Sequence, residues 1–246
     1  FSKLYGLDKK KIKKKKLKII FDYLKKKNIH FFDCSNDYKN LSSFSGYFFN
    51  KTKLFYKIKV NNIKTKLFLK EILSINKNIY CLMIHNIDRY SVKDLKKNYF
   101  ILKNFSKTIP KFKIGISIYD IKDLNLIKKS NLRFDYIQIP INILNNTFTK
   151  KNTFELRSKG SKFIARSIFL QGLLLKNSNK IIKHKQFRNT FTQIENFSNK
   201  YRITNLELCL DYIKKQRWIN KFIIGIDNEF QLKKILSIIR LNKKIK

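Results

Sequence analysis

The chain has 246 residues, a mass of 29.7 kDa and a hydrophobic content of 43%, which is enough for one large core. Its 56 lysines and arginines stand against 16 aspartates and glutamates, which gives a formal net charge of +40 at pH 7. The sequence has no P-loop, no G-x-G-x-x-G motif, no clustered cysteines or histidines and no apolar window of membrane-spanning length, which argues against a Rossmann domain, a metal site and a membrane protein.

Short apolar runs alternate with helical hydrophobic periods along the whole chain, and no linker interrupts them. The predicted strands are residues 29–32, 54–60, 80–84, 113–118, 136–139, 162–165 and 222–226. The predicted helices are residues 11–27, 63–75, 92–107, 120–130, 203–216 and 228–240. Such alternation favours βα units around a parallel sheet. We therefore expect an α/β fold, a single (β/α)8 barrel domain of the TIM type over residues 1–246. Because only seven strands can be placed, its first strand is expected to be missing.

One stretch does not follow this alternation. Residues 176–202 are rich in lysine, asparagine and serine, and we predict a loop there that shapes a substrate pocket.

Four polar residues stand at or just after the ends of the first three predicted strands. Asp33 and Tyr38 follow the first, Lys59 closes the second and His85 closes the third. Catalytic groups of parallel βα barrels collect at these strand ends. A phenol can protonate the oxygen of a carbonyl that accepts hydride, and a nearby ammonium lowers the phenol pKa. A carboxylate offsets the cost of burying that ammonium, and an imidazole can orient the carbonyl.

Simpler interpretations exist for each of these residues. An aspartate after an apolar run is often a helix N-cap, a lone histidine is often structural, and Tyr38 could simply pack. Lys57 and Lys59 share one face of the strand, because side chains alternate with a period of two. Lys59 is nearer the strand end, so we prefer it as the candidate and keep Lys57 as the alternative.

Blocks in a fixed order resemble the aldo-keto reductase family. They are DCSNDYKN (33–40), LMIHN (82–86), KIGISIYD (113–120), YIQIPIN (136–142), ARSIFLQGLL (165–174) and FIIGID (222–227). The ARSIFLQGLL block is typical of the branch whose genes often lie among those for surface-polysaccharide synthesis. Residues 1–7 resemble the loop after the family's opening strand, so we expect an N-terminally truncated chain.

The resemblance implies carbonyl reduction by hydride transfer, with Asp33, Tyr38, Lys59 and His85 as the catalytic residues. It also implies a nicotinamide cofactor, NADP with NAD as the alternative, in which Lys233 or Lys234 replaces the arginine that often contacts the 2′-phosphate. The implied cofactor contacts are Ser117, Gln138, Arg166, Ser167, Gln171, Gly225, Asp227, Asn228 and Gln231. In the family's pattern, Ile118 stands where an asparagine is common, and Gln231 stands where that arginine is common.

The expected partner is a small carbonyl compound, which could be sugar-derived, in a cytoplasmic enzyme. The excess charge is mostly lysine spread over nearly every predicted helix, which indicates compositional bias rather than a specific nucleic-acid surface. Two alternatives stay open at this point. The chain could be a catalytically decayed barrel, because a missing strand leaves sheet edges exposed, or a lysine-rich nucleic-acid-binding protein.

Overall fold

The computed structural model describes residues 14–35, 51–59, 78–108, 112–176 and 188–240. Within these ranges seven strands form one sheet, and every neighbouring pair is parallel. The strands follow one another across the sheet in chain order: β1 (Phe31–Ser35), β2 (Lys53–Lys59), β3 (Ile79–His85), β4 (Lys113–Ser117), β5 (Tyr136–Pro140), β6 (Lys162–Arg166) and β7 (Lys221–Phe222).

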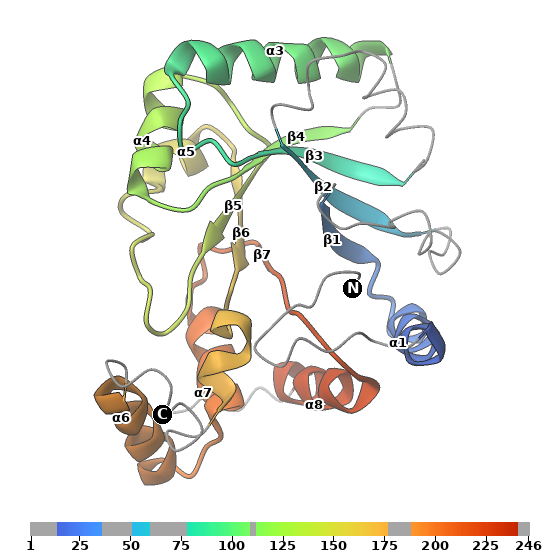
Figure 1. Cartoon of the computed structure of the whole chain (residues 1–246), viewed down its shortest axis with the longest axis vertical. Helices are drawn as coiled ribbons and strands as arrows, with labels where there is room; N and C mark the ends of the chain where they lie inside the picture. The colour runs from blue at the N-terminus through green and yellow to red at the C-terminus, as the bar shows by residue number, and fades with distance from the viewer. Residues whose placement is uncertain (1–13, 36–50, 60–77, 109–111, 177–187, 241–246) are drawn as a thin grey trace.

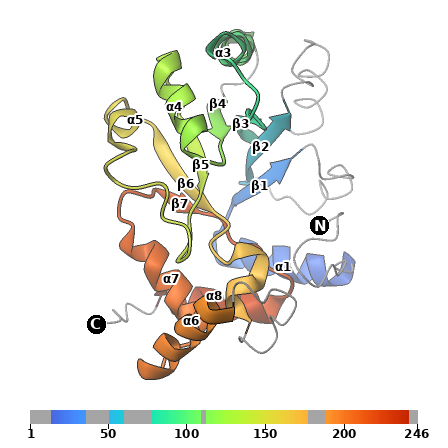
Figure 2. The same ribbon diagram turned by 60° about the vertical axis from the view of Figure 1, so that its left-hand side comes forward.

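Helices cover the outer face of this sheet (Figures 1 and 2). They are α1 (Lys14–Lys26), α3 (Val92–Thr108), α4 (Ile121–Ser130), α5 (Phe154–Ser158), α7 (Asn205–Lys215) and α8 (Glu229–Arg240). Helix α6 (Arg188–Lys200) lies beyond α7, and a 3-10 segment η3 (Leu170–Leu175) follows β6. α1 packs against α8, α3 against α4, and α7 against both α6 and α8. None of these helices combines the length and the apolar character that crossing a bilayer requires.

The sheet curls until its two outermost strands approach each other. The Lys221 ammonium on β7 lies 4.0 Å from the ring centroid of Phe31 on β1. The strands follow one another in chain order with helices between them, which is the arrangement expected of a (β/α)n barrel. The predicted absence of a first strand concerns a segment before Phe1, and residues 1–13 are outside the described residues, so this expectation stays a prediction. The predicted helix at 63–75 also lies outside the described residues.

Side chains of the strands alternate between two hydrophobic layers. One set points outward and meets the helices, as Leu54, Ile58 and Ile116 do. The other set forms an inner cluster of the curled sheet: Phe55, Cys81, Met83, Tyr136 and Ile164, with Phe31 against it. Because a strand alternates with period two, the polar residues that continue the inner set are placed at the strand ends.

Capping fixes where several helices begin. The Asp120 side chain accepts from the Asp123 N–H and starts α4, and Thr204 and Glu207 form a reciprocal capping box at the start of α7. These caps satisfy backbone donors that have no partner within the helix.

Two sequence expectations need correction. The loop predicted for 176–202 contains helix α6, which buries Phe191, Ile194 and Ser198 on one face. The strand predicted at 222–226 is reduced to Lys221–Phe222, because β6 offers β7 only Ile164 and Ala165 as paired neighbours.

Candidate active site

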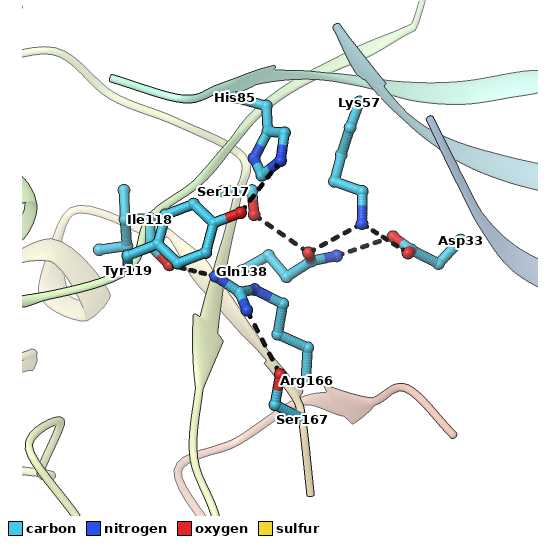
Figure 3. Close-up of polar contacts among 9 residues, drawn as sticks. All are labelled: Asp33, Lys57, His85, Ser117, Ile118, Tyr119, Gln138, Arg166 and Ser167. Carbon is cyan, nitrogen blue, oxygen red and sulfur yellow. Dashed lines mark hydrogen bonds and ion pairs between the residues drawn. The ribbon is translucent and has the colours of Figure 1, made fainter. Parts of the chain in front are cut away.

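Six strands each contribute a polar side chain at the carboxyl end of the curled sheet. Each of these residues comes two positions after a residue that faces the inner cluster of the sheet. Because side chains alternate along a strand with a period of two, each polar side chain also points inward. The residues are Asp33 (β1), Lys57 (β2), His85 (β3), Ser117 (β4), Gln138 (β5) and Arg166 (β6). The sequence placed Asp33, His85, Ser117, Gln138 and Arg166 at strand ends, and the structure brings them together (Figure 3).

A hydrogen-bonded network occupies one side of this site. The Lys57 ammonium lies 2.7 Å from an Asp33 carboxylate oxygen and donates to the Gln138 Oε1 over 3.4 Å. The Gln138 amide N–H donates to the other Asp33 oxygen at 2.8 Å, and the Ser117 hydroxyl donates to Gln138 Oε1 at 3.1 Å. Ser117 and Gln138 are fully buried. The network therefore holds one ammonium and one carboxylate at a fixed place.

The described partner of Asp33 is the lysine that the sequence analysis kept as the alternative. We predicted that Lys59 would pair with it, and the structure pairs it with Lys57, whose side chain is only 9% exposed. Lys59 follows two positions later, beside His85 in the strand ladder, and its side chain is outside the described part of the structure. The sequence pattern could not separate two lysines two positions apart, because the choice depends on how far each ammonium reaches.

The other side of the site is a cluster around Tyr119, which the sequence analysis did not single out as a site residue. The Tyr119 hydroxyl lies 3.3 Å from His85 Nε2, and the Arg166 guanidinium lies 4.3 Å from the Tyr119 ring centroid. Arg166 also donates to the Ile118 carbonyl at 3.0 Å and to the Ser167 hydroxyl at 3.3 Å. Figure 3 shows the phenol between the imidazole and the guanidinium.

The loop after β6 has an unusual backbone. Ser167, Leu170 and Gln171 have φ values of 59°, 46° and 56°, and Gly172 has a φ of 87°. Left-handed conformations of non-glycine residues are uncommon and concentrate at functional sites. The predicted cofactor contacts Ser167 and Gln171 therefore belong to a tightly turned segment that begins at the Arg166 end of the site.

The predicted contacts before α8 act as a helix cap in this structure. The Asn228 side chain accepts from the Gln231 N–H, and the Gln231 side chain accepts from the Asp227 N–H, both at 2.8 Å. A helix N-terminus favours a bound anion. Gly225 lies just before this cap, after β7. The Lys233 ammonium pairs with Glu229, the first residue of α8, at 2.7 Å and also lies over the Tyr23 ring.

Tyr38, the predicted proton donor, lies outside the described residues. Cys34 follows Asp33 directly, but burial and the neighbouring carboxylate raise the pKa of its thiol to about 12, so it stays protonated at neutral pH. Among the described residues, no three histidine, cysteine, aspartate or glutamate side chains come together as a metal-binding group. The described side chains bring an ammonium, a carboxylate, an imidazole, a phenol and an amide to the site.

Comparison with known proteins identifies the family. The model of the aldo/keto reductase family matches residues 3–246. A solved structure named "Putative aldo-keto reductase from Pseudomona aeruginosa" has the same fold, with a TM-score of 0.65 and 9% sequence identity over 91% of this chain and 82% of that one. No curated protein matches the chain. The chain belongs to the aldo/keto reductase family, whose members are oxidoreductases that reduce carbonyl compounds and generally use NAD(P)H.

Proposed function

We propose that this protein reduces an aldehyde or ketone to the alcohol, with sugar-derived carbonyls among the candidate substrates and NADPH as the preferred cofactor. The observation that carries the proposal is the buried network of Asp33, Lys57, Gln138 and Ser117 at the same strand ends as His85. An ammonium paired with a carboxylate and an imidazole at a neighbouring strand end are groups that can orient a carbonyl and assist its protonation. All three cysteines are free and buried, which fits a reducing compartment, and we propose a cytoplasmic location.

The residues present fit a nicotinamide. The buried hydroxyl of Ser117 and the buried amide of Gln138 offer the polar groups that a carboxamide requires, and Gln138 is fixed in place by Asp33 and Lys57. Arg166 and the turned loop at Ser167 and Gln171 would hold the pyrophosphate through positive charge and backbone N–H groups. The bound cofactor supplies the hydride.

Each side chain then has a separate task. His85 hydrogen-bonds the substrate oxygen and orients the carbonyl. Tyr38 gives its phenolic proton to that oxygen as negative charge develops on it. Lys57 stabilises the phenolate that forms on Tyr38, and Asp33 offsets the cost of burying the ammonium. We assign this role to Lys57 because of its 2.7 Å ion pair, and keep Lys59 as the alternative.

The test is turnover by the purified protein. NADPH oxidation is followed with a panel of small aldehydes, in parallel with Tyr38→Phe and His85→Ala. We expect measurable reduction by the parent protein and a fall in kcat of roughly 10²-fold or more in each variant, the usual contribution of a general acid. A parent protein that binds NADPH but reduces no aldehyde of the panel would favour a catalytically decayed barrel.

The cofactor preference has its own test in two neighbouring lysines. Lys233 and Lys234 on α8 are both exposed, and Lys233 is paired with Glu229. If Lys234 contacts the 2′-phosphate, Lys234→Gln weakens NADPH binding up to about fivefold, the range of an exposed charge pair, and leaves NADH binding unchanged. Lys233→Gln is the matched control and should alter neither. Equal effects of both variants on NADPH would indicate only general attraction between the cationic surface and the cofactor.

A further inference from the structure

Tyr119 stands at the mouth of the site, and its hydroxyl lies against the imidazole that the proposed reaction uses. It follows the last residue of β4 by two positions and is 50% exposed, so it borders both the site and the solvent. Its hydroxyl is 3.3 Å from His85 Nε2, and the two rings lie 5.6 Å apart between centroids. The phenol therefore lies next to the imidazole that would orient the substrate carbonyl.

One contact holds the Tyr119 ring, and two more fix the backbone around it. The Arg166 guanidinium stacks on its ring at 4.3 Å, a geometry that favours a cation over an aromatic face. The backbone N–H of Tyr119 donates to a carboxylate oxygen of buried Asp123 at 2.8 Å. Asp120, the next residue, caps helix α4. These contacts fix the backbone and ring of a side chain that would otherwise be mobile at a surface.

The protonation of the pair decides what the phenol can offer. When His85 carries its proton on Nε2, as it must to donate to a carbonyl, the Tyr119 oxygen can only accept from it. The Tyr119 O–H proton is then left for another acceptor. When a substrate binds, its carbonyl oxygen takes the single Nε2–H over from Tyr119, so the imidazole and the phenol become two separate donors whose heavy atoms lie 3.3 Å apart. Two oxygens on adjacent carbon atoms, such as a carbonyl and an α-hydroxyl, have a similar separation and could engage one donor each.

From this geometry we propose that Tyr119 is a specificity-determining residue, and that its hydroxyl selects carbonyl substrates with a second oxygen on the neighbouring carbon. This inference rests on the proposed reductase function. His85 binds the reacting carbonyl oxygen, Tyr119 donates to the α-oxygen, and Arg166 keeps the phenol in position. A substrate without the α-oxygen leaves the Tyr119 hydroxyl to solvent or to His85 and gains nothing from it.

The test compares 2-hydroxypropanal with propanal, which differ only in the α-hydroxyl, in the whole chain with NADPH. Tyr119→Phe keeps the ring under Arg166 and removes only the hydroxyl. We expect kcat/KM for 2-hydroxypropanal to fall roughly 2- to 12-fold, the range that one net hydrogen bond gives, with propanal nearly unchanged. The control is Tyr201→Phe, since Tyr201 also lies under a cation, Lys200, and beside Phe197, but it follows α6.

The outcomes separate this inference from the proposed function. A parent protein that reduces neither aldehyde overturns the proposed function and the inference with it. A parent protein that reduces both, with the same ratio of kcat/KM values in Tyr119→Phe, overturns the inference alone. An equal loss for both aldehydes also overturns it, because the phenol would then act only by positioning His85. NADPH binding and thermal unfolding of the variant are measured alongside, and both should match the parent protein.

Discussion

Removing the Lys57 ammonium should cost the protein much of its stability. Lys57→Met leaves the Asp33 carboxylate, which is only 13% exposed, without its cation. Breaking a buried ion pair by deleting one partner typically costs about 3–5 kcal/mol. The Gln138 N–H still donates to Asp33, so we expect the lower end, about 3 kcal/mol. Domains of this kind have a free energy of unfolding of about 5–15 kcal/mol, so this change is large.

A double-mutant cycle shows whether the pair itself is responsible. Asp33→Asn alone should also destabilise, since it leaves the Lys57 ammonium without a carboxylate. In the double variant the oxygen of the introduced amide can still accept from Gln138, and neither charge remains. We expect the double variant to regain most of the lost free energy, to within roughly 1.5 kcal/mol of the parent protein.

Urea unfolding followed by the fluorescence of Trp218, the protein's only tryptophan, measures these values. Lys59→Met is the matched control on the same strand, because it leaves the Asp33–Lys57 pair in place and should cost less. The reasoning is refuted if Lys57→Met costs under about 1 kcal/mol, or if the two single losses simply add. Carbonyl reduction by the double variant should stay low even though its stability recovers, which would separate the chemical role of the pair from its structural role.

Two further predictions concern the core and the Tyr119 segment. Gly115→Ala places a methyl carbon 2.9 Å from Cys81 Sγ and 3.0 Å from Met83 in the inner cluster, so we expect a loss of about 1–3 kcal/mol in the same urea experiment, and an unchanged midpoint would show that the cluster is loosely packed. Burial raises the pKa of the Asp123 carboxyl, so the native state binds this proton more tightly than the unfolded state does. The protonated carboxyl therefore contributes most to stability below the ordinary pKa of aspartate. This contribution is lost as the pH rises through the raised pKa of the native state. Asp123→Asn keeps an acceptor for the Tyr119 N–H, and its melting temperature relative to the parent protein should therefore rise from acid to neutral pH; a difference that does not change with pH would contradict this.

Much of the site could be predicted from the sequence for a simple geometric reason. A short apolar run that ends in a polar residue and is followed by a helical period places that residue at the carboxyl end of a parallel strand. Asp33, His85, Ser117 and Gln138 follow this pattern, and the structure brings their strand ends together. The resemblance to a family added their expected roles, which remain proposals.

The features that the sequence did not reveal depend on contacts between distant segments. The pairing of Asp33 with Lys57 depends on how far each ammonium reaches across the curled sheet. Tyr119 lies after a strand rather than at its end, and only Arg166, 47 positions later, shows why its ring is held. The lysine and asparagine content around α6 hid the apolar face that makes it a helix. Local pattern carries little information about such contacts.

The most direct test of hydride transfer follows the hydrogen itself. The protein is incubated with an aldehyde and NADPH that carries deuterium at the transferable position of the nicotinamide, and the alcohol is analysed by mass spectrometry. Two cofactors are compared, each with deuterium at one of the two hydrogen positions of the reduced nicotinamide carbon. We predict that one of them places one deuterium on the former carbonyl carbon and that the other places none there. Alcohol without deuterium from either cofactor, or no alcohol while the cofactor is bound, would contradict the proposed reductase.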